Sequence, residues 1–157
     1  MTGKTTIDKQ AAHKQFSASC FNEAWDFIDK QNRSREDELN MLLAAMASLW
    51  HWKQRPDTSA TNLSVGFWQV SRVYCLLGET ENARKYGLLS LEESRKEEVA
   101  PFYLGYSYEA LARAAALAGD REKMGEYLNL ARDACEQVKD EDSRKMLLDD
   151  LATILLH

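Results

Sequence analysis

The chain carries one sequence pattern twice. Residues 72–90 read RVYCLLGETENARKYGLLS, and residues 113–131 read RAAALAGDREKMGEYLNLA. At one constant offset, Arg72 aligns with Arg113 and Gly78 aligns with Gly119. Self-similarity at a fixed period of about 20–50 residues is typical of repeat architectures, in which each unit packs against its neighbours. The repeat therefore constrains the fold more strongly than any other feature of the sequence.

The apolar residues recur at helical spacing, and no segment alternates in the way that a strand does. Ser34, followed three residues later by Asp37, predicts a capping box at a helix start. Pro101 suits the first position of a helix, and Gly78 and Gly119 suit left-handed caps that end helices. These signals predict seven helices, at about 11–30, 35–53, 59–77, 80–97, 101–118, 121–138 and 142–156.

Short connections make successive helices antiparallel. We therefore expect an all-α fold with a single domain over 1–157, built as an antiparallel helix-pair solenoid. Its helix pairs are predicted at about 11–54, 59–97 and 101–138, with a C-terminal capping helix at about 142–156. The last helix has more apolar residues than one packing stripe requires, so we expect part of it to form a homodimer contact.

The composition excludes several classes of function. The net charge is −5, and acidic residues are interspersed along the whole chain, which disfavours nucleic-acid binding. No apolar run approaches the ~20 residues that span a membrane, and the polar N-terminal segment does not resemble a signal peptide. The three cysteines, Cys20, Cys75 and Cys135, form no C-x-x-C pair and are expected to be buried thiols. We expect a cytoplasmic protein.

The two copies also match a known helix–turn–helix pattern of aromatic, small and apolar residues. Residues 67–87 supply Phe67-x2-Val70-Ser71-x2-Tyr74, the turn at Gly78 and Ala83-x3-Gly87. Residues 108–128 supply Tyr108-x2-Leu111-Ala112-x2-Ala115, the turn at Gly119 and Met124-x3-Leu128. Over about 59–138 the chain thus resembles the tetratricopeptide-repeat family.

The period is longer than the about 34 residues of that family, by roughly two helical turns. One extra turn on each helix would keep the packing faces in phase, which indicates a long-helix variant. Armadillo and HEAT repeats, with periods of about 40 residues, remain an alternative. The segments FNEAWD, WQVSRVY and YEALARAAA also resemble uncharacterised bacterial repeat proteins.

The resemblance implies which residues face a ligand, because one side of each first helix lines the concave groove of such repeats. The residues predicted to line this side are Asn22, Asp26, Trp68, Arg72, Tyr106, Glu109 and Arg113. His51, between two tryptophans, is predicted either to be a packed histidine with one hydrogen bond or to contact a ligand at the lip of the groove. Aromatic and arginine side chains are enriched where binding energy concentrates. Alternatively, the acidic and basic members of this set neutralise one another across the stack. Trp25 and Trp50 lie on or beside apolar stripes, so we expect them in the core.

The sequence offers no motif of catalysis. We expect no catalytic residue, no metal site and no cofactor, because no nucleophile motif, phosphate loop or H-E-x-x-H occurs. The favoured function is a non-enzymatic module that binds a protein or peptide partner through the groove. One alternative is a small anionic-ligand-binding or enzymatic pocket that uses Asp26, His51, Arg72 and Glu109. Another is a regulatory subunit that acts through a second chain.

Overall fold

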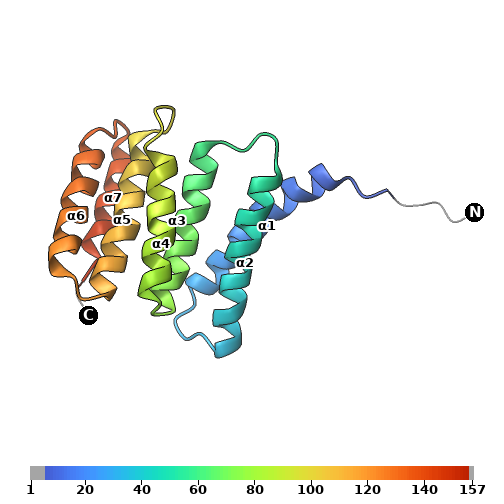
Figure 1. The fold of residues 1–157 in the computed structure, drawn as a ribbon, viewed down its shortest axis with the longest axis horizontal. Coiled ribbons are helices and arrows are strands. Elements are labelled where there is room, and N and C mark those ends of the chain that lie inside the picture. Colours follow the sequence, from blue (N-terminus) through green and yellow to red (C-terminus); the bar gives the residue numbers. More distant parts are fainter. Residues whose placement is uncertain (1–5, 156–157) are drawn as a thin grey trace, which may run out of the picture. The chain divides into compact units, whose positions relative to one another are not determined.

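The computed structural model describes residues 6–155, which form seven helices and no strand (Figure 1). Neighbouring helices in the order of the chain pack against each other within each of the two units defined below. The helices are α1 (Lys9–Ile28), α2 (Arg35–Gln54), α3 (Ala60–Leu76), α4 (Thr80–Ser94), α5 (Pro101–Leu117), α6 (Arg121–Glu136) and α7 (Glu141–Ala152). The all-α prediction is therefore confirmed. None of the described helices combines the length and the apolar character needed to cross a lipid bilayer.

Helix starts agree closely with the sequence signals, and helix ends agree less well. The predicted capping box at the start of α2 is present, with Ser34 and Asp37 each bonded to the other's backbone. α1 begins earlier than predicted because the carboxylate of Asp8 accepts hydrogen bonds from the second and third backbone N–H groups. α7 ends at Ala152, before the predicted end at 156, a residue outside the described part of the chain.

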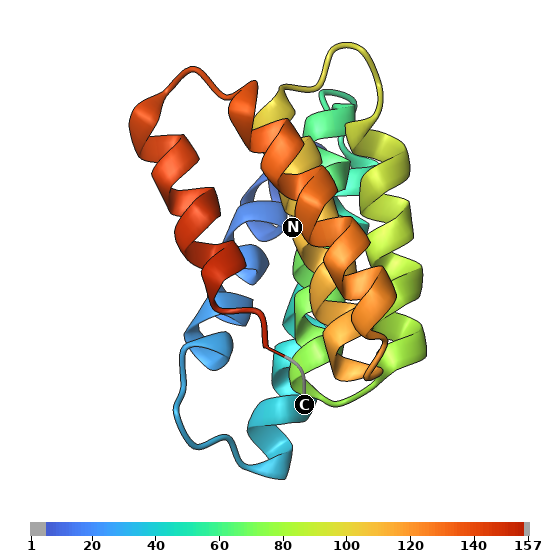
Figure 2. The same ribbon diagram turned by 90° about the vertical axis from the view of Figure 1, so that its left-hand side faces the viewer.

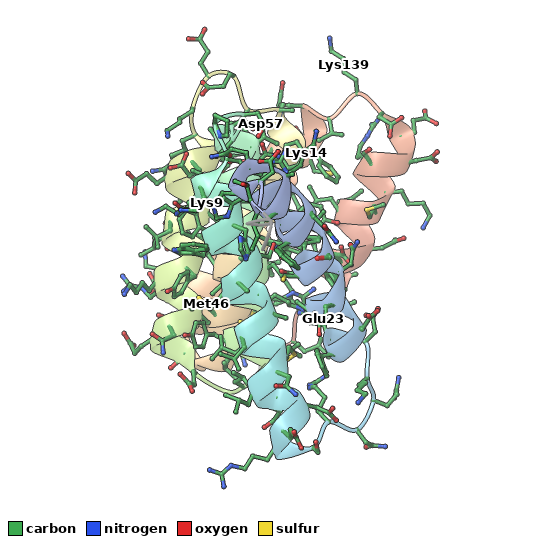
Figure 3. The ribbon with its side chains drawn as sticks, turned by 90° about the vertical axis from the view of Figure 1, so that its right-hand side faces the viewer. Lys9, Lys14, Glu23, Met46, Asp57 and Lys139 are labelled. Carbon is green, nitrogen blue, oxygen red and sulfur yellow. The ribbon has the colours of Figure 1, made fainter. Side chains whose placement is uncertain are left out.

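The chain divides into two compact units between Thr58 and Ser59. The first contains α1 and α2, which form an antiparallel hairpin (Figure 3). The hydroxyl of Ser48 donates to the carbonyl oxygen of Ser17 over 2.7 Å, so small residues let the two helices approach closely. Lys14 and Asp57 lie near each other at the end of the hairpin opposite its connecting turn.

The prediction that Trp50 lies in the core is wrong, because the buried face of α2 is rotated away from it. Trp50 is 55% exposed, and Leu39 and Leu43 are exposed as well. The buried positions of α2 are instead the smaller set Met41, Ala44, Ala45, Ser48 and Leu49. Large apolar side chains would hold the helices too far apart for the Ser48–Ser17 hydrogen bond, which explains why small residues occupy this face.

The second unit contains α3 to α7, and its first two helix pairs have the same design. The offset that aligns Arg72 with Arg113 also separates both ends of α3 from those of α5, and the start of α4 from that of α6. Gly78 and Gly119 adopt φ values of 75° and 73° at the two turns, where other residues would be strained. The Glu79 N–H donates to the Tyr74 carbonyl over 2.9 Å, and the equivalent bond from Asp120 to Ala115 is also 2.9 Å.

The core of the second unit lies between the helix pairs. A Cβ at Gly87 of α4 would lie 2.9 Å from Cδ2 of Leu111 in α5, so glycine allows these helices to approach closely. α7 packs on α5 and α6 (Figure 2). It buries Leu147 and Leu151 but leaves Met146 and Leu148 exposed. The core cluster comprises Leu91, Tyr108, Leu111, Ala112, Ala116, Ala131, Cys135, Leu147, Leu151 and Ile154. The homodimer contact stays a prediction.

The cysteines differ in burial. Cys135 is buried as predicted, but Cys20 and Cys75 are partly exposed, so the prediction of three buried thiols is wrong for these two.

Candidate functional site

Positions 68 and 109 are equivalent under the repeat and lie on α3 and α5, and position 150, at the same spacing along the chain, lies on α7. They hold Trp68, Glu109 and Asp150. The indole Nε1–H of Trp68 donates to Oε2 of Glu109 over 2.8 Å. Equivalent positions of α3 and α5 therefore touch each other, and the three positions place a row of polar side chains across three helices.

The carboxylate of Glu109 is enclosed by donors. The residue is only 2% exposed, and its Oε1 accepts a hydrogen bond from Nε of Arg113, one helical turn away. Nη2 of Arg113 also donates to the Asp150 carbonyl oxygen over 3.0 Å and to the Thr153 hydroxyl over 2.8 Å. A charge in the interior is tolerated only when it is paired and hydrogen-bonded. Arg113 thus compensates Glu109 and ties α5 to the end of α7.

Tyr106 of α5 completes the connection to α7. Its hydroxyl donates to Oδ2 of Asp150 over 2.5 Å. The pKa of the Tyr106 phenol is raised far above its usual value. Burial is the larger cause, and the hydrogen bond to the Asp150 carboxylate is the second. The ring of Tyr106 meets that of Trp68 edge to face, with centroids 5.4 Å apart. Tyr106 therefore remains a neutral donor, and its side chain joins α3, α5 and α7.

Arg72 of α3 differs from its repeat equivalent Arg113. The residue one turn before Arg72 is Trp68, whereas Arg113 has Glu109 there. As a result, the Arg72 guanidinium makes no hydrogen bond or ion pair with any residue between 6 and 155. Its pKa is lowered, first by burial and then by the nearby positive charge of Arg113, although arginine stays protonated in proteins.

Arg72 and Arg113 line a cavity of about 110 Å³. Apolar side chains from the ends of α3 and α5 and from the segment after α7 form much of the rest of its wall, including Leu76, Leu117, Ile154 and Leu155. The cavity therefore combines a positively charged wall with an apolar one.

Cys75 also lines this cavity, but its thiol is held in the unreactive, protonated form. Burial raises the pKa of the Cys75 thiol to about 11, and the positive charge of Arg72 opposes that shift only in part. The thiolate is the reactive form of cysteine, so this group is a neutral thiol near pH 7. The polar groups offered to a ligand are hydrogen-bond donors, with no base among the described lining residues placed to accept a proton.

The other predicted site residues belong to the first unit. Asn22 and Asp26 are exposed on α1. His51 of α2 lies against His13 of α1, with 2.8 Å between their Nδ1 atoms. Sequence reasoning missed His13 as the partner of His51. The two residues lie at similar distances along the chain from the turn at 29–34, so pairing the helices antiparallel about that turn would have found the contact.

The described residues include no group of three or more His, Cys, Asp and Glu side chains that could hold a metal ion. No protein-family model, no curated protein and no solved structure matches this chain. The candidate site is therefore defined by its own geometry, which is a half-buried guanidinium beside a small, partly apolar cavity.

Proposed function

We propose that this chain is a non-enzymatic interaction module of the tetratricopeptide-repeat type, in a long-helix variant, which binds an acidic segment of a partner protein at Arg72. The repeated helix bounds and the two matching turns support the repeat architecture. Helical repeats use the exposed sides of stacked helices as extended binding surfaces. In this chain the Trp68 and Arg72 side chains of α3 and the Tyr106 side chain of α5 are each partly exposed.

The contrast between two equivalent arginines carries this proposal. Arg113 already has a carboxylate, a carbonyl oxygen and a hydroxyl as acceptors. Arg72 has the same place in its repeat and has no acceptor among residues 6–155. Partial burial has removed much of the water that would otherwise bond to its planar group of donors. A carboxylate fits the geometry of that group, with two parallel hydrogen bonds.

The surrounding groups favour binding over catalysis. In the alternative of an enzymatic pocket, Glu109 would act with Asp26, His51 and Arg72. Both oxygens of Glu109 already accept hydrogen bonds, from Trp68 and from Arg113. The Glu109 carboxylate is therefore already engaged in contacts that hold α3 and α5 together.

A labelled acidic peptide tests the proposal. Hexaglutamate, acetylated and amidated at its ends, is the probe, and hexaglutamine is its neutral counterpart. A hydrogen bond to a charged group contributes about 1.5–3 kcal/mol. Arg72→Gln should therefore weaken hexaglutamate binding by about tenfold to a hundredfold in fluorescence anisotropy.

Arg132→Gln is the matched control because Arg132 is exposed on α6 and its loss changes the net charge equally. This variant should bind hexaglutamate like the unmodified chain. Equal weakening by Arg72→Gln and Arg132→Gln would mean that only overall charge attracts the peptide. Such a result, or equal binding of hexaglutamine, would refute the proposal.

A further inference from the structure

The volume of the cavity beside Arg72 indicates the size of the group that would fill it. Its volume is about 110 Å³. An apolar cavity of about 150 Å³ in another protein holds benzene, which has six carbon atoms. In proportion, this cavity has room for about four or five non-hydrogen atoms. That is the size of acetate or propionate, or of the end of a glutamate side chain.

The walls of the cavity indicate how such a group would lie. The guanidinium of Arg72 is the donor without an acceptor among residues 6–155, so it defines the charged end. Leu76, Leu117 and Ile154 supply apolar walls. Methylene groups next to a carboxylate would contact these side chains and leave water. The two ends of the cavity thus match the two ends of a short aliphatic acid.

We infer that the cavity is a binding site for an unbranched carboxylate of about propionate size, held at Arg72 and packed between Leu76, Leu117 and Ile154. This inference rests on the proposed function in using Arg72 as the anchor, and it adds the length of the group that is accepted. The same chemistry can come from a free short-chain acid or from a glutamate side chain of a partner. An aspartate side chain, with one methylene fewer, would leave part of the apolar wall exposed to water.

A chain-length series measures this selectivity. The probes are formate, acetate, propionate, butyrate and hexanoate at constant ionic strength, with chloride as the simple anion and propanamide as the neutral isostere of propionate. Binding is followed by NMR, from the Arg72 Nε–H signal and the backbone amides of Leu76 and Leu117. Each methylene that enters the cavity should tighten binding by about fourfold. Affinity should thus rise from formate to propionate, and hexanoate should gain much less than about fourfold per added methylene.

Two variants separate the charged end from the apolar end. Arg72→Gln should abolish the saturable shifts with every acid. Cys75→Met fills the cavity and keeps Arg72, so it should remove the gain from acetate to propionate. Arg132→Gln should behave like the unmodified chain. Circular dichroism of each variant checks that the helices are retained.

Four outcomes distinguish this inference from the proposed function. A rise in affinity to propionate, with a plateau from propionate to hexanoate, supports the inference. Saturable binding of hexaglutamate but not of hexaglutamine then identifies a glutamate side chain as the source. The same rise and plateau without peptide binding supports a free acid and refutes the proposed function alone. Peptide binding at Arg72 with no dependence on acid length refutes the inference alone. Shifts reproduced by chloride or propanamide, or unchanged in Arg72→Gln, overturn the inference as well.

Discussion

The buried pair of Glu109 and Arg113 gives the sharpest stability prediction. Glu109→Gln preserves the size of the side chain and an acceptor for Trp68, but it removes the negative charge beside Arg113. Removing one partner of a buried ion pair typically costs about 3–5 kcal/mol. Gln keeps part of the hydrogen bonding, and the Arg113 side chain is 12% exposed. We therefore expect Glu109→Gln to lower the free energy of unfolding by about 2–3 kcal/mol. An unsatisfied buried polar group, which costs about 1–3 kcal/mol, contributes to this loss.

Urea unfolding followed at Trp68 measures the loss in the free energy of unfolding within the second unit, which contains Glu109. Trp68 is the one tryptophan of the second unit, because Trp25, Trp50 and Trp52 precede Ser59. Incorporated 5-fluorotryptophan gives a ¹⁹F signal for each, and Trp68→Phe assigns that of Trp68. Glu126→Gln is the control, because Glu126 pairs with Lys123 through side chains that are about half exposed. The control should unfold like the unmodified chain. A Glu109→Gln variant as stable as this control would refute the role given to the pair.

Two further predictions concern packing and pH. Gly87→Ala should destabilise the fold by about 1–3 kcal/mol, because the new Cβ would meet Leu111. Gly125→Ala should stabilise the fold by about 0.5–1 kcal/mol, because no heavy atom lies within 4 Å of the new Cβ. Urea midpoints of the two variants that move in the same direction would contradict this prediction. Burial, and then the charge of His13, lower the pKa of His51, so the unfolded chain takes up a proton more readily. The melting temperature should therefore fall as the pH drops below about 6.5, and less so in a His13→Gln, His51→Gln double variant.

The repeat explains why much of the second unit could be predicted from sequence. A fixed offset forces the turns at Gly78 and Gly119 into the same conformation, and Pro101 marks a helix start independently of packing. These are local signals, and the structure reproduces them. The choice of buried face is not local. On α2 it depends on which residues let a neighbouring helix approach, so alanine and serine are buried while Trp50 is exposed.

In the candidate site, too, the local features could be predicted from sequence and the contacts between helices could not. The sequence pattern placed Trp68, Arg72, Glu109 and Arg113 on one side of the first helices. It left open whether the acidic and basic members of the set pair with each other, as Glu109 and Arg113 do. It could not show that Arg113 is also bonded to the end of α7. That contact depends on where the chain turns after Ala152, which brings Thr153 to the guanidinium. Sequence alone therefore indicates two equivalent arginines, and the structure distinguishes them.

Comparing Arg72→Gln with Arg113→Gln in thermal unfolding tests the central claim most directly, because it needs no ligand. Arg113→Gln leaves the carboxylate of Glu109 buried without its ion-pair partner, so its melting temperature should fall clearly. Arg72→Gln removes a charge that has no hydrogen bond to residues 6–155 and lies near Arg113, so its melting temperature should stay the same or rise slightly. Equal falls in the two variants would contradict the account, because Arg72 would then be a structural residue and would not be available to a ligand.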